Sequence, residues 1–301
     1  MERRRELMTH MNVHEATVNS IEEERHGCVV PIVIKPAQGW ASLRLKDLWE
    51  YRELLYFLTL RDLRVRYAQT VLGVLWAVIR PVSIMVVFST FFGGFAHIPS
   101  DGLPYPLFAY SAVLLWQLFA QTLTGASNSL VVNQNLITKV YFPRLIIPLS
   151  VAVASIFDFL IASVVLVGMM GYYHVLPTSL VLLVPLFVLL ALVTSMGVGL
   201  WFSALNVRYR DVGYALPFAL QVWLFATPVI YPVSLIPESW RFWIGLNPMA
   251  SVVEGVRWVV LGIHHDHLAV MVELSVAVAI ALFVSGLYYF RRVEQTFADV
   301  M

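Results

Sequence analysis

Cysteine and charge are scarce in this chain of 301 residues. The single Cys28 excludes an intrachain disulfide framework and a metal site built from several cysteines. Charged residues make up 13% and hydrophobic residues 59% of the chain, whereas soluble domains hold about 25% and 45–50%. The basic residues form no stripe along which a nucleic acid could bind. These proportions predict an all-α integral membrane protein with several spans and no nucleic-acid partner.

The motifs of several common active sites are also missing. There is no G-x-x-x-x-G-K-[ST] phosphate loop, no H-E-x-x-H pair and no G-x-S-x-G nucleophile elbow. Three histidines (His264, His265 and His267, with Asp266) are better explained as a solvated turn than as a metal site. The first 70 residues lack the apolar core of a cleavable signal peptide. Such a protein takes the energy for any transport from elsewhere.

Six apolar stretches are each about long enough to cross a bilayer as a helix, at 71–96, 103–124, 145–172, 176–205, 212–231 and 268–290. Lysine and arginine precede the first stretch and then recur in every second connection. By the positive-inside rule, this pattern predicts that both termini lie in the cytoplasm. The basic positions are Arg61, Arg64, Arg66, Lys139, Arg144, Arg208, Arg210, Arg291 and Arg292.

The chain is predicted to divide into four parts. Residues 1–39 carry mixed charge, which predicts a mostly mobile cytoplasmic tail with a possible short strand at 29–36. Residues 40–70 mix aromatic and arginine side chains. That mixture is typical of an amphipathic helix in the headgroup layer, or of one packed on a cytoplasmic partner. Residues 71–292 form the six-span domain, and 293–301 form a cytoplasmic C-terminal tail.

The stretch 128–148 is the most informative of the cytoplasmic connections. It is too apolar for a solvated loop, three amides interrupt it, and a Lys-x-Tyr-Phe-Pro-Arg run follows. Val132, Leu136 and Val140 recur at the spacing that places them on one helical face. The pattern predicts a short amphipathic helix that either lies on the membrane surface or docks into a groove of another protein.

The connection 232–267 is long and apolar, and it predicts a helical hairpin on the outer side. Pro237 opens a first short helix that Gly245 ends. Asn247 is a good N-cap with Pro248 at the first helical position, and Gly262 closes this second helix. Both helices are too short to span and too apolar for open water. We therefore expect a re-entrant hairpin that borders a pathway.

Charges within the apolar stretches are candidate functional groups. Arg80 lies inside the first stretch, where it could bind a substrate phosphate or extend to the inner interface. Asp158 lies near the middle of the third, where a hydrogen bond between helices and a contact with substrate are both open. Glu273 is close enough to the outer end of the last stretch to reach water. Glu254 and Arg257 are three residues apart and predict a structural ion pair.

Aromatic side chains form a second group of candidates. Sugar rings stack on aromatic faces through their C–H surfaces, so an aromatic corridor would suit a glycan. Contact with lipid or packing between helices is the alternative for each of them. The candidates are Trp76, Phe88, Phe91 and Phe92 in the first stretch and Phe218, Trp223 and Phe225 in the fifth.

Five ordered blocks of sequence resemble one known family. They are RDLRVRYAQTVLGVLWAVIRP (61–81), NQNLITKVYFPRLIIP (133–148), ALNVRYRDV (204–212), FATPVIYP (225–232) and LNPMASVVEGVRW (246–258). Together they resemble the membrane subunit of bacterial ABC-type polysaccharide exporters, which move lipid-linked O-antigen, teichoic acid or capsular chains. The resemblance runs from about residue 40 to the C-terminus.

The resemblance implies a permease of the bacterial inner membrane that is not itself an enzyme and binds no cofactor. It implies a homodimer surrounded by membrane lipids, with ATP and Mg²⁺ bound by a separate cytoplasmic ATPase subunit. The implied substrate is a glycan on an undecaprenyl diphosphate carrier. The helix within 40–70 would be the interface helix that contacts the ATPase.

The resemblance also implies roles for particular residues. Arg64, Arg66 and Arg80 are candidates for the diphosphate, because guanidinium groups bind phosphate oxygens in a forked geometry. The ATPase-coupling residues would be Asn133, Gln134, Asn135, Lys139, Tyr141, Phe142 and Arg144. The periplasmic gate would comprise Trp240, Trp243, Asn247, Pro248, Glu254, Arg257 and Trp258.

Two other functions remain open from the residues alone. An ion-coupled secondary transporter or channel would have ionisable groups clustered at mid-membrane, and here Asp158 alone clearly qualifies. An integral-membrane enzyme would have several acidic or histidine residues converging at one interface, and the sequence offers no such set.

Overall fold

The computed structural model describes residues 49–68, 70–263 and 268–294, and every regular element in these ranges is a helix. The predicted all-α class is thereby confirmed. The strand considered at 29–36, the N-terminal tail and the histidine group at 264–267 lie outside the described residues. The described residues all belong to one compact unit that begins at Leu43.

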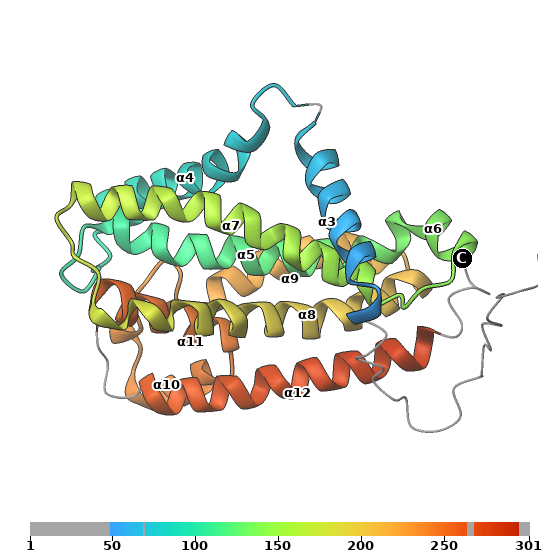
Figure 1. The fold of residues 1–301 in the computed structure, drawn as a ribbon. Coiled ribbons are helices and arrows are strands. Elements are labelled where there is room, and N and C mark those ends of the chain that lie inside the picture. The colour runs from blue at the N-terminus through green and yellow to red at the C-terminus, as the bar shows by residue number, and fades with distance from the viewer. Residues whose placement is uncertain (1–48, 69, 264–267, 295–301) are drawn as a thin grey trace, which may run out of the picture. The chain divides into compact units, whose positions relative to one another are not determined.

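Four long helices form the body of this unit and run side by side in Figure 1: α5 (Tyr105–Val132), α7 (Ile146–Tyr172), α8 (Val184–Arg208) and α12 (Leu268–Glu294). Helix α5 packs against both α7 and α8, and α8 packs against α12. Within its apolar window, 78% of α5 is buried, against 11% of the first span at Gly73–Phe95. Helix α5 is therefore the central helix, and the first span lies at the surface.

Small residues set the close approach of α8 and α12. A Cβ atom added to Gly286 would lie 2.2 Å from the carbonyl oxygen of Gly197, so only glycine allows this contact. One turn further along, the rings of Trp201 and Tyr289 stack with centroids 4.3 Å apart. The indole N–H of Trp201 also donates to Ser285 Oγ at 3.1 Å. These contacts join the two helices over about one turn of each, at 197–201 and 285–289.

Among the described residues, five helical segments are long and apolar enough to cross a membrane: Gly73–Phe95, Tyr105–Val132, Ile146–Tyr172, Ser179–Arg208 and Leu268–Glu294. The predicted fifth span, 212–231, instead forms α9 (Asp211–Ala226), an apolar helix of 16 residues. Thr227 is extended (φ −104°, ψ 139°) because it precedes Pro228, which disfavours the helical conformation. Six spans were expected, but α9 is shorter than a membrane-crossing helix, so the described helices that are long enough number five.

The N-terminal described helix, α3 (Arg52–Tyr67), lies within the range expected for the interface helix and packs against α7. Figure 1 shows it meeting the first span at an angle. The first span begins at Gly73, whose φ of +49° is accessible to glycine at little cost. The first span then comprises the 3₁₀ turn Gly73–Leu75, α4 (Trp76–Phe88) and the π-helical segment Ser89–Phe95.

The short helices lie at opposite ends of the bundle (Figure 1). Helix α6 (Gln134–Lys139) lies at the end where α12 finishes. At the other end lie α10 (Glu238–Gly245), α11 (Pro248–Val256) and the π-helical turn Arg257–Leu261. Two 3₁₀ segments, Ser179–Leu183 and Val233–Leu235, complete the described elements. The α6 end collects the predicted basic connections, since α5, α8 and α12 all finish there.

The hairpin at the other end begins and ends as predicted. Pro237 precedes α10, and the side chain of Asn247 caps α11 by accepting from the Met249 N–H at 3.2 Å. Gly262 closes the segment in the left-handed conformation, with φ of +80°. The expected hairpin of two short helices is therefore present, while its depth in a membrane stays a prediction.

Candidate functional site

At the α6 end, the connection from α5 to α7 forms a short helix followed by an exposed turn. Helix α5 ends at Val132, and Asn133 closes its last turn by donating from its side-chain amide to Ser129 O at 2.8 Å. Val140 is extended, with φ of −131° and ψ of 133°. The single helical face predicted through Val132, Leu136 and Val140 is therefore wrong, because the capping amide divides it.

The predicted coupling residues fall into an exposed group and an anchored group. Gln134 begins α6 and Lys139 ends it, and the side chains of Asn135, Lys139 and Tyr141 are exposed. Tyr141 retains 75% of its accessible surface, whereas its neighbour Phe142 retains 5%. Phe142 packs in the cluster of buried side chains that also includes Leu58 of α3. The connection thus presents a polar and aromatic edge on a buried apolar base.

Arg144 joins this base to the end of α12. Its backbone N–H donates to Glu294 Oε1 at 3.3 Å, and its guanidinium donates to the Glu294 carbonyl oxygen. Glu294 also pairs with Arg291 at 3.0 Å. A displacement of the α6 connection would therefore reach both α7 and α12.

Helix α3 is bound to α7 by charged and hydroxyl groups. Arg66 and Tyr67 both donate to the carboxylate of Asp158, which is 5% exposed. One turn earlier on α3, the carboxylate of Asp62 accepts a hydrogen bond from Ser150 Oγ of α7 at 3.0 Å. Burial, followed by the hydrogen bond to Asp158, raises the pKa of Tyr67 to about 12, so its hydroxyl remains a donor. Of the two roles left open for Asp158, the contact between helices is the one observed.

The three arginines predicted to bind phosphate differ in their surroundings. Arg66 is held by Asp158, with 32% of its side chain exposed. Arg64 and Arg80 are exposed, on α3 and α4 respectively. Arg64 and Arg80 thus present accessible cations, whereas Arg66 would have to be shared between Asp158 and any added anion.

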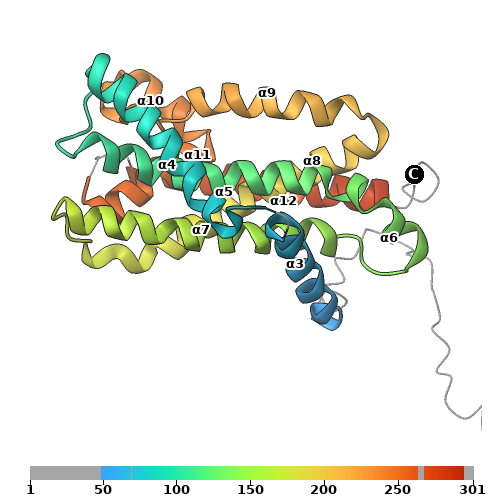
Figure 2. The same ribbon diagram turned by 90° about the horizontal axis from the view of Figure 1, so that it is seen from above.

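The predicted aromatic corridor also divides by exposure. Trp76, Phe91, Phe218 and Phe225 are 40%, 57%, 72% and 55% exposed. Phe88 and Phe92 are half-buried and meet edge to face, with ring centroids 5.7 Å apart. The exposed members lie on the first span and on α9, and Figure 2 shows α9 running along one side of the bundle.

Trp223 differs from the other aromatic candidates because it belongs to the outer hairpin's contacts. Its ring packs edge to face on Phe119 of α5, with centroids 4.9 Å apart. Its indole N–H donates to Asn247 Oδ1 at 3.0 Å. The expected channel residue therefore also positions the N-cap of α11.

The predicted gate residues are exposed on α10 and buried on α11. Trp240 and Trp243 are 63% and 62% exposed. Every residue of α11 is buried, from Pro248 onward, and Trp258 in the following turn is half-buried. The two helices of the hairpin therefore have different surroundings, and they are not equivalent as parts of a gate.

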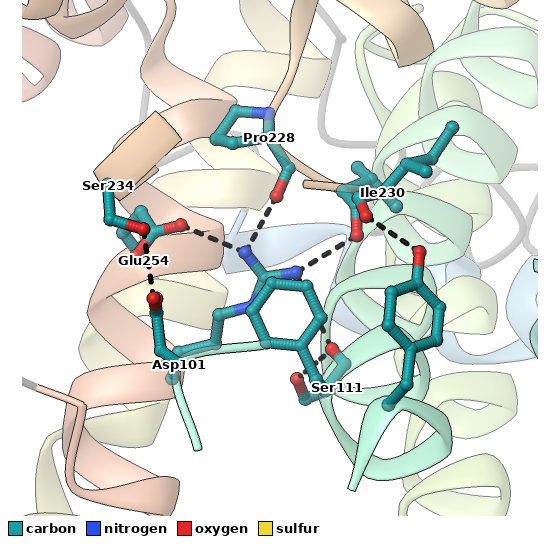
Figure 3. Close-up of polar contacts among 10 residues, drawn as sticks. Asp101, Ser111, Pro228, Ile230, Ser234 and Glu254 are labelled. Atoms are coloured by element: carbon teal, nitrogen blue, oxygen red, sulfur yellow. Dashed lines mark hydrogen bonds and ion pairs between the residues drawn. The ribbon is translucent and has the colours of Figure 1, made fainter. Parts of the chain in front are cut away.

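The predicted pair of Glu254 and Arg257 is present and lies in the protein interior. Arg257 is fully buried and Glu254 is 3% exposed, with Nη1 and Oε1 2.9 Å apart. Arg257 Nη1 donates both to this carboxylate and to the carbonyl oxygen of Pro228 in the segment after α9, and Figure 3 labels these two partners. The ring of Phe108 covers it, with the guanidinium carbon 3.5 Å from the ring centroid. Because the Arg257 cation is removed from water, its hydrogen bonds and its ion pair with Glu254 must offset the cost of burying the charge.

A family profile described as ABC-2 type transporter matches residues 53–261. The chain belongs to the ABC-2 type transporter family. Among curated relatives of this ABC-2 chain, the O-antigen export system permease protein RfbA of Myxococcus xanthus is 30% identical. That alignment covers 83% of this chain and 96% of the relative. RfbA of Klebsiella pneumoniae is 28% identical over 86% and 100% of the two chains. The polysialic acid transport protein KpsM of Escherichia coli is 24% identical over 75% and 90%.

The family suggested by the five sequence blocks is thereby confirmed for this ABC-2 chain. The profile match runs from α3 to the π-helical turn after α11, so it includes the α6 connection and the outer hairpin. Two residues of α5 were missed by the sequence reasoning: Tyr105, which donates to Ile230 O in the segment after α9, and Phe108, whose ring covers Arg257. Their only local signal is an aromatic pair at a helix start, which is common in membrane proteins.

Proposed function

We propose that this chain is the transmembrane subunit of an ATP-driven exporter of lipid-linked polysaccharide in the bacterial inner membrane. It would act as a homodimer with a separate cytoplasmic ATPase. The observation that carries the proposal is the 30% identity to an O-antigen export permease over 96% of that relative's length. An alignment of nearly complete length favours a shared task over a shared module.

We propose that α9 and the irregular residues after it complete a sixth crossing. Helix α8 finishes at the α6 end of the bundle, and α10 begins at the opposite end (Figures 1 and 2). The intervening chain must therefore run the length of the bundle. Sixteen helical residues rise about 24 Å, and the irregular residues 227–231 continue the chain toward the far side of a hydrocarbon core of about 30 Å. With this crossing, both termini lie on the cytoplasmic side.

The α6 connection is the proposed contact for the ATPase. Its exposed edge at Tyr141 offers a surface for a groove in the partner, and its buried base at Phe142 and Arg144 is joined to α3 and α12. ATP binding by the partner would press on this edge, and the base would pass the displacement to the spans. The substrate glycan would then move along the exposed aromatic side chains of the first span and α9, with its diphosphate near Arg64 and Arg80.

An ion-driven mechanism has less support. Asp158 is the mid-span carboxylate that such a mechanism would use, but it already accepts from Arg66 and Tyr67. The described residues also contain no group of three or more histidine, cysteine or acidic side chains suited to a metal ion.

The replacement Tyr141→Glu tests the proposal. Because Tyr141 is exposed, the chain should fold and insert, while a carboxylate in place of the aromatic ring should disrupt the contact with the ATPase. We expect polysaccharide export to fall at least tenfold and the ATPase to co-purify in lower yield. The matched control is Leu176→Glu, an equally exposed position (86%) near the outer ends of α7 and α8. Normal export and normal co-purification of the Tyr141→Glu variant would refute the coupling role.

A further inference from the structure

The segment that follows α9 is irregular, yet its carbonyl groups are hydrogen-bonded. Ala226 O accepts from the Asn247 side chain at 3.3 Å, and Thr227 O accepts from the Val229 N–H at 2.7 Å. Arg257 donates to Pro228 O at 2.7 Å and to Val229 O at 2.9 Å. The Ile230 carbonyl oxygen accepts from the Tyr105 hydroxyl at 2.7 Å (Figure 3). Each carbonyl from 226 to 230 thus has a partner.

Most of these partners come from the hairpin or from α5 rather than from the segment itself. Non-helical backbone at membrane depth is tolerated only where protein or water satisfies it. Separating α11 from this segment would expose carbonyl groups and, at Arg257, a buried cation. Asn247, Arg257 and Tyr105 therefore hold the outer end of α9 against α11 and α5.

Helix α11 is also bound on its other sides. Ser251 and Ser275 of α12 share a hydrogen bond of 2.7 Å, and Ser275 Oγ also donates to Gly245 O at 2.8 Å. Gly255 packs against the ring of Phe187 in α8, so closely that an added Cβ would lie 2.1 Å from it. The hydroxyl of Thr178 donates to Val259 O. Helix α11 and the π-helical turn after it thus contact α8, α12, the segment after α9 and the connection between α7 and α8.

Two surfaces near this group lack such contacts in the protomer. One is the face of α9 that carries Tyr214, Phe218, Val222 and Phe225, which are 82%, 72%, 55% and 55% exposed. The other is the first span, which is 11% buried in its apolar window. These surfaces can change neighbours without breaking a buried polar contact.

We propose that α11 is a fixed wall and that Asn247, Arg257 and Tyr105 are positioning residues that hold the outer end of α9 on it. The hairpin then keeps its place against α5 throughout the export cycle. The inference rests on the proposed export function. It revises the role of α11 from a moving gate to the support of α9.

A crosslink between the hairpin and the start of α5 provides the first test. Asp101 Oδ1 and Ser234 Oγ are 2.9 Å apart, and they join the connection before α5 to the start of the hairpin. The variant Asp101→Cys with Ser234→Cys, made in a Cys28→Ser background, would be oxidised in the complete complex with its ATPase. Export should stay within twofold of the reduced sample. A fall of tenfold or more that a reductant reverses would overturn the fixed wall.

The second test separates positioning from folding. Arg257→Lys keeps a charge but loses the planar fork that reaches two carbonyl groups at once. We expect at least tenfold less polysaccharide exported per ATP hydrolysed, measured on equal amounts of monodisperse complex in proteoliposomes. Arg241→Lys, at a position paired with exposed Glu238 on α10, is the matched control and should match the parent. An unchanged ratio for Arg257→Lys would overturn the positioning role. Absence of export by the unmodified complex would instead refute the proposed function.

Discussion

The contact between α8 and α12 allows a sharp prediction, because a single methyl group has no space there. In Gly286→Ala, the new Cβ would lie 2.2 Å from Gly197 O, about 1.2 Å closer than the 3.4 Å at which ordinary contact begins. The opposing atom belongs to the backbone, so no side-chain rotation relieves the clash. The two helices must separate, and their contacts at Trp201 and Tyr289 must lengthen.

The magnitude follows from two opposing effects. Overpacking a well-packed interior costs about 1–3 kcal/mol, and alanine in place of glycine within a helix returns up to about 1 kcal/mol. Because the clash is with backbone, we expect the upper part of the range and a net loss of about 2 kcal/mol. For chains of 150–250 residues, each kcal/mol of lost stability lowers the unfolding temperature by roughly 2–4 °C, and we expect a shift of this order per kcal/mol here.

The assay is the thermal unfolding of the purified protein in detergent, followed by the loss of its monodisperse peak. Gly168→Ala is the matched control, since this glycine also lies within a membrane helix but an added Cβ there meets nothing within 4 Å. Gly168→Ala should be neutral or slightly stabilising. Equal unfolding temperatures for the Gly286→Ala and Gly168→Ala variants would refute the close approach of α8 and α12.

Three further variants test other contacts. Asp158→Asn weakens the attachment of α3, at a cost of about 1–3 kcal/mol, below the loss for a fully buried pair because Arg66 is one-third exposed. Faster proteolysis within α3 would report it, and an unchanged digestion rate would contradict it. Asn206→Leu removes the amide that joins α8 to the end of α5, and should cost about 1–3 kcal/mol in thermal unfolding. A stability equal to the parent would show that the contact is dispensable. Gly255→Ala should destabilise the protein through Phe187, and Phe187→Leu should restore part of the loss with a coupling of about 0.5–3 kcal/mol. Additive effects in that double-mutant cycle would exclude the contact.

Local chemistry in the sequence predicted the short helices of the hairpin well. The caps at Asn247 and Gly262 depend on residues a few positions away, so their geometry is present in the sequence itself. The same local rule could have corrected one error. Thr227 precedes Pro228, which marks a probable helix end, yet hydropathy alone extended the span to 231. Hydropathy measures apolar length and does not detect a break in backbone conformation.

Contacts between distant parts of the chain lay beyond sequence reasoning. Arg66 and Asp158 are separated by 92 positions, and nothing in either neighbourhood identifies the other. The backbone partners of Arg257 are even harder to predict, because a carbonyl group carries no side-chain signature. The prediction that Glu254 pairs with Arg257 succeeded because the two are one helical turn apart. It could not show that the pair also supports the end of α9.

The uneven burial of the spans bears on how exporters of this kind could be redesigned for new cargo. Substitutions in α5 would disturb packing on every side, because 78% of its apolar window is buried. The first span and α9 expose most of their aromatic side chains, so a mutant library confined to them would keep most of its members folded. If the glycan moves along these side chains as proposed, selection for altered glycan preference would be most productive there, with α5 and α11 kept constant as the scaffold.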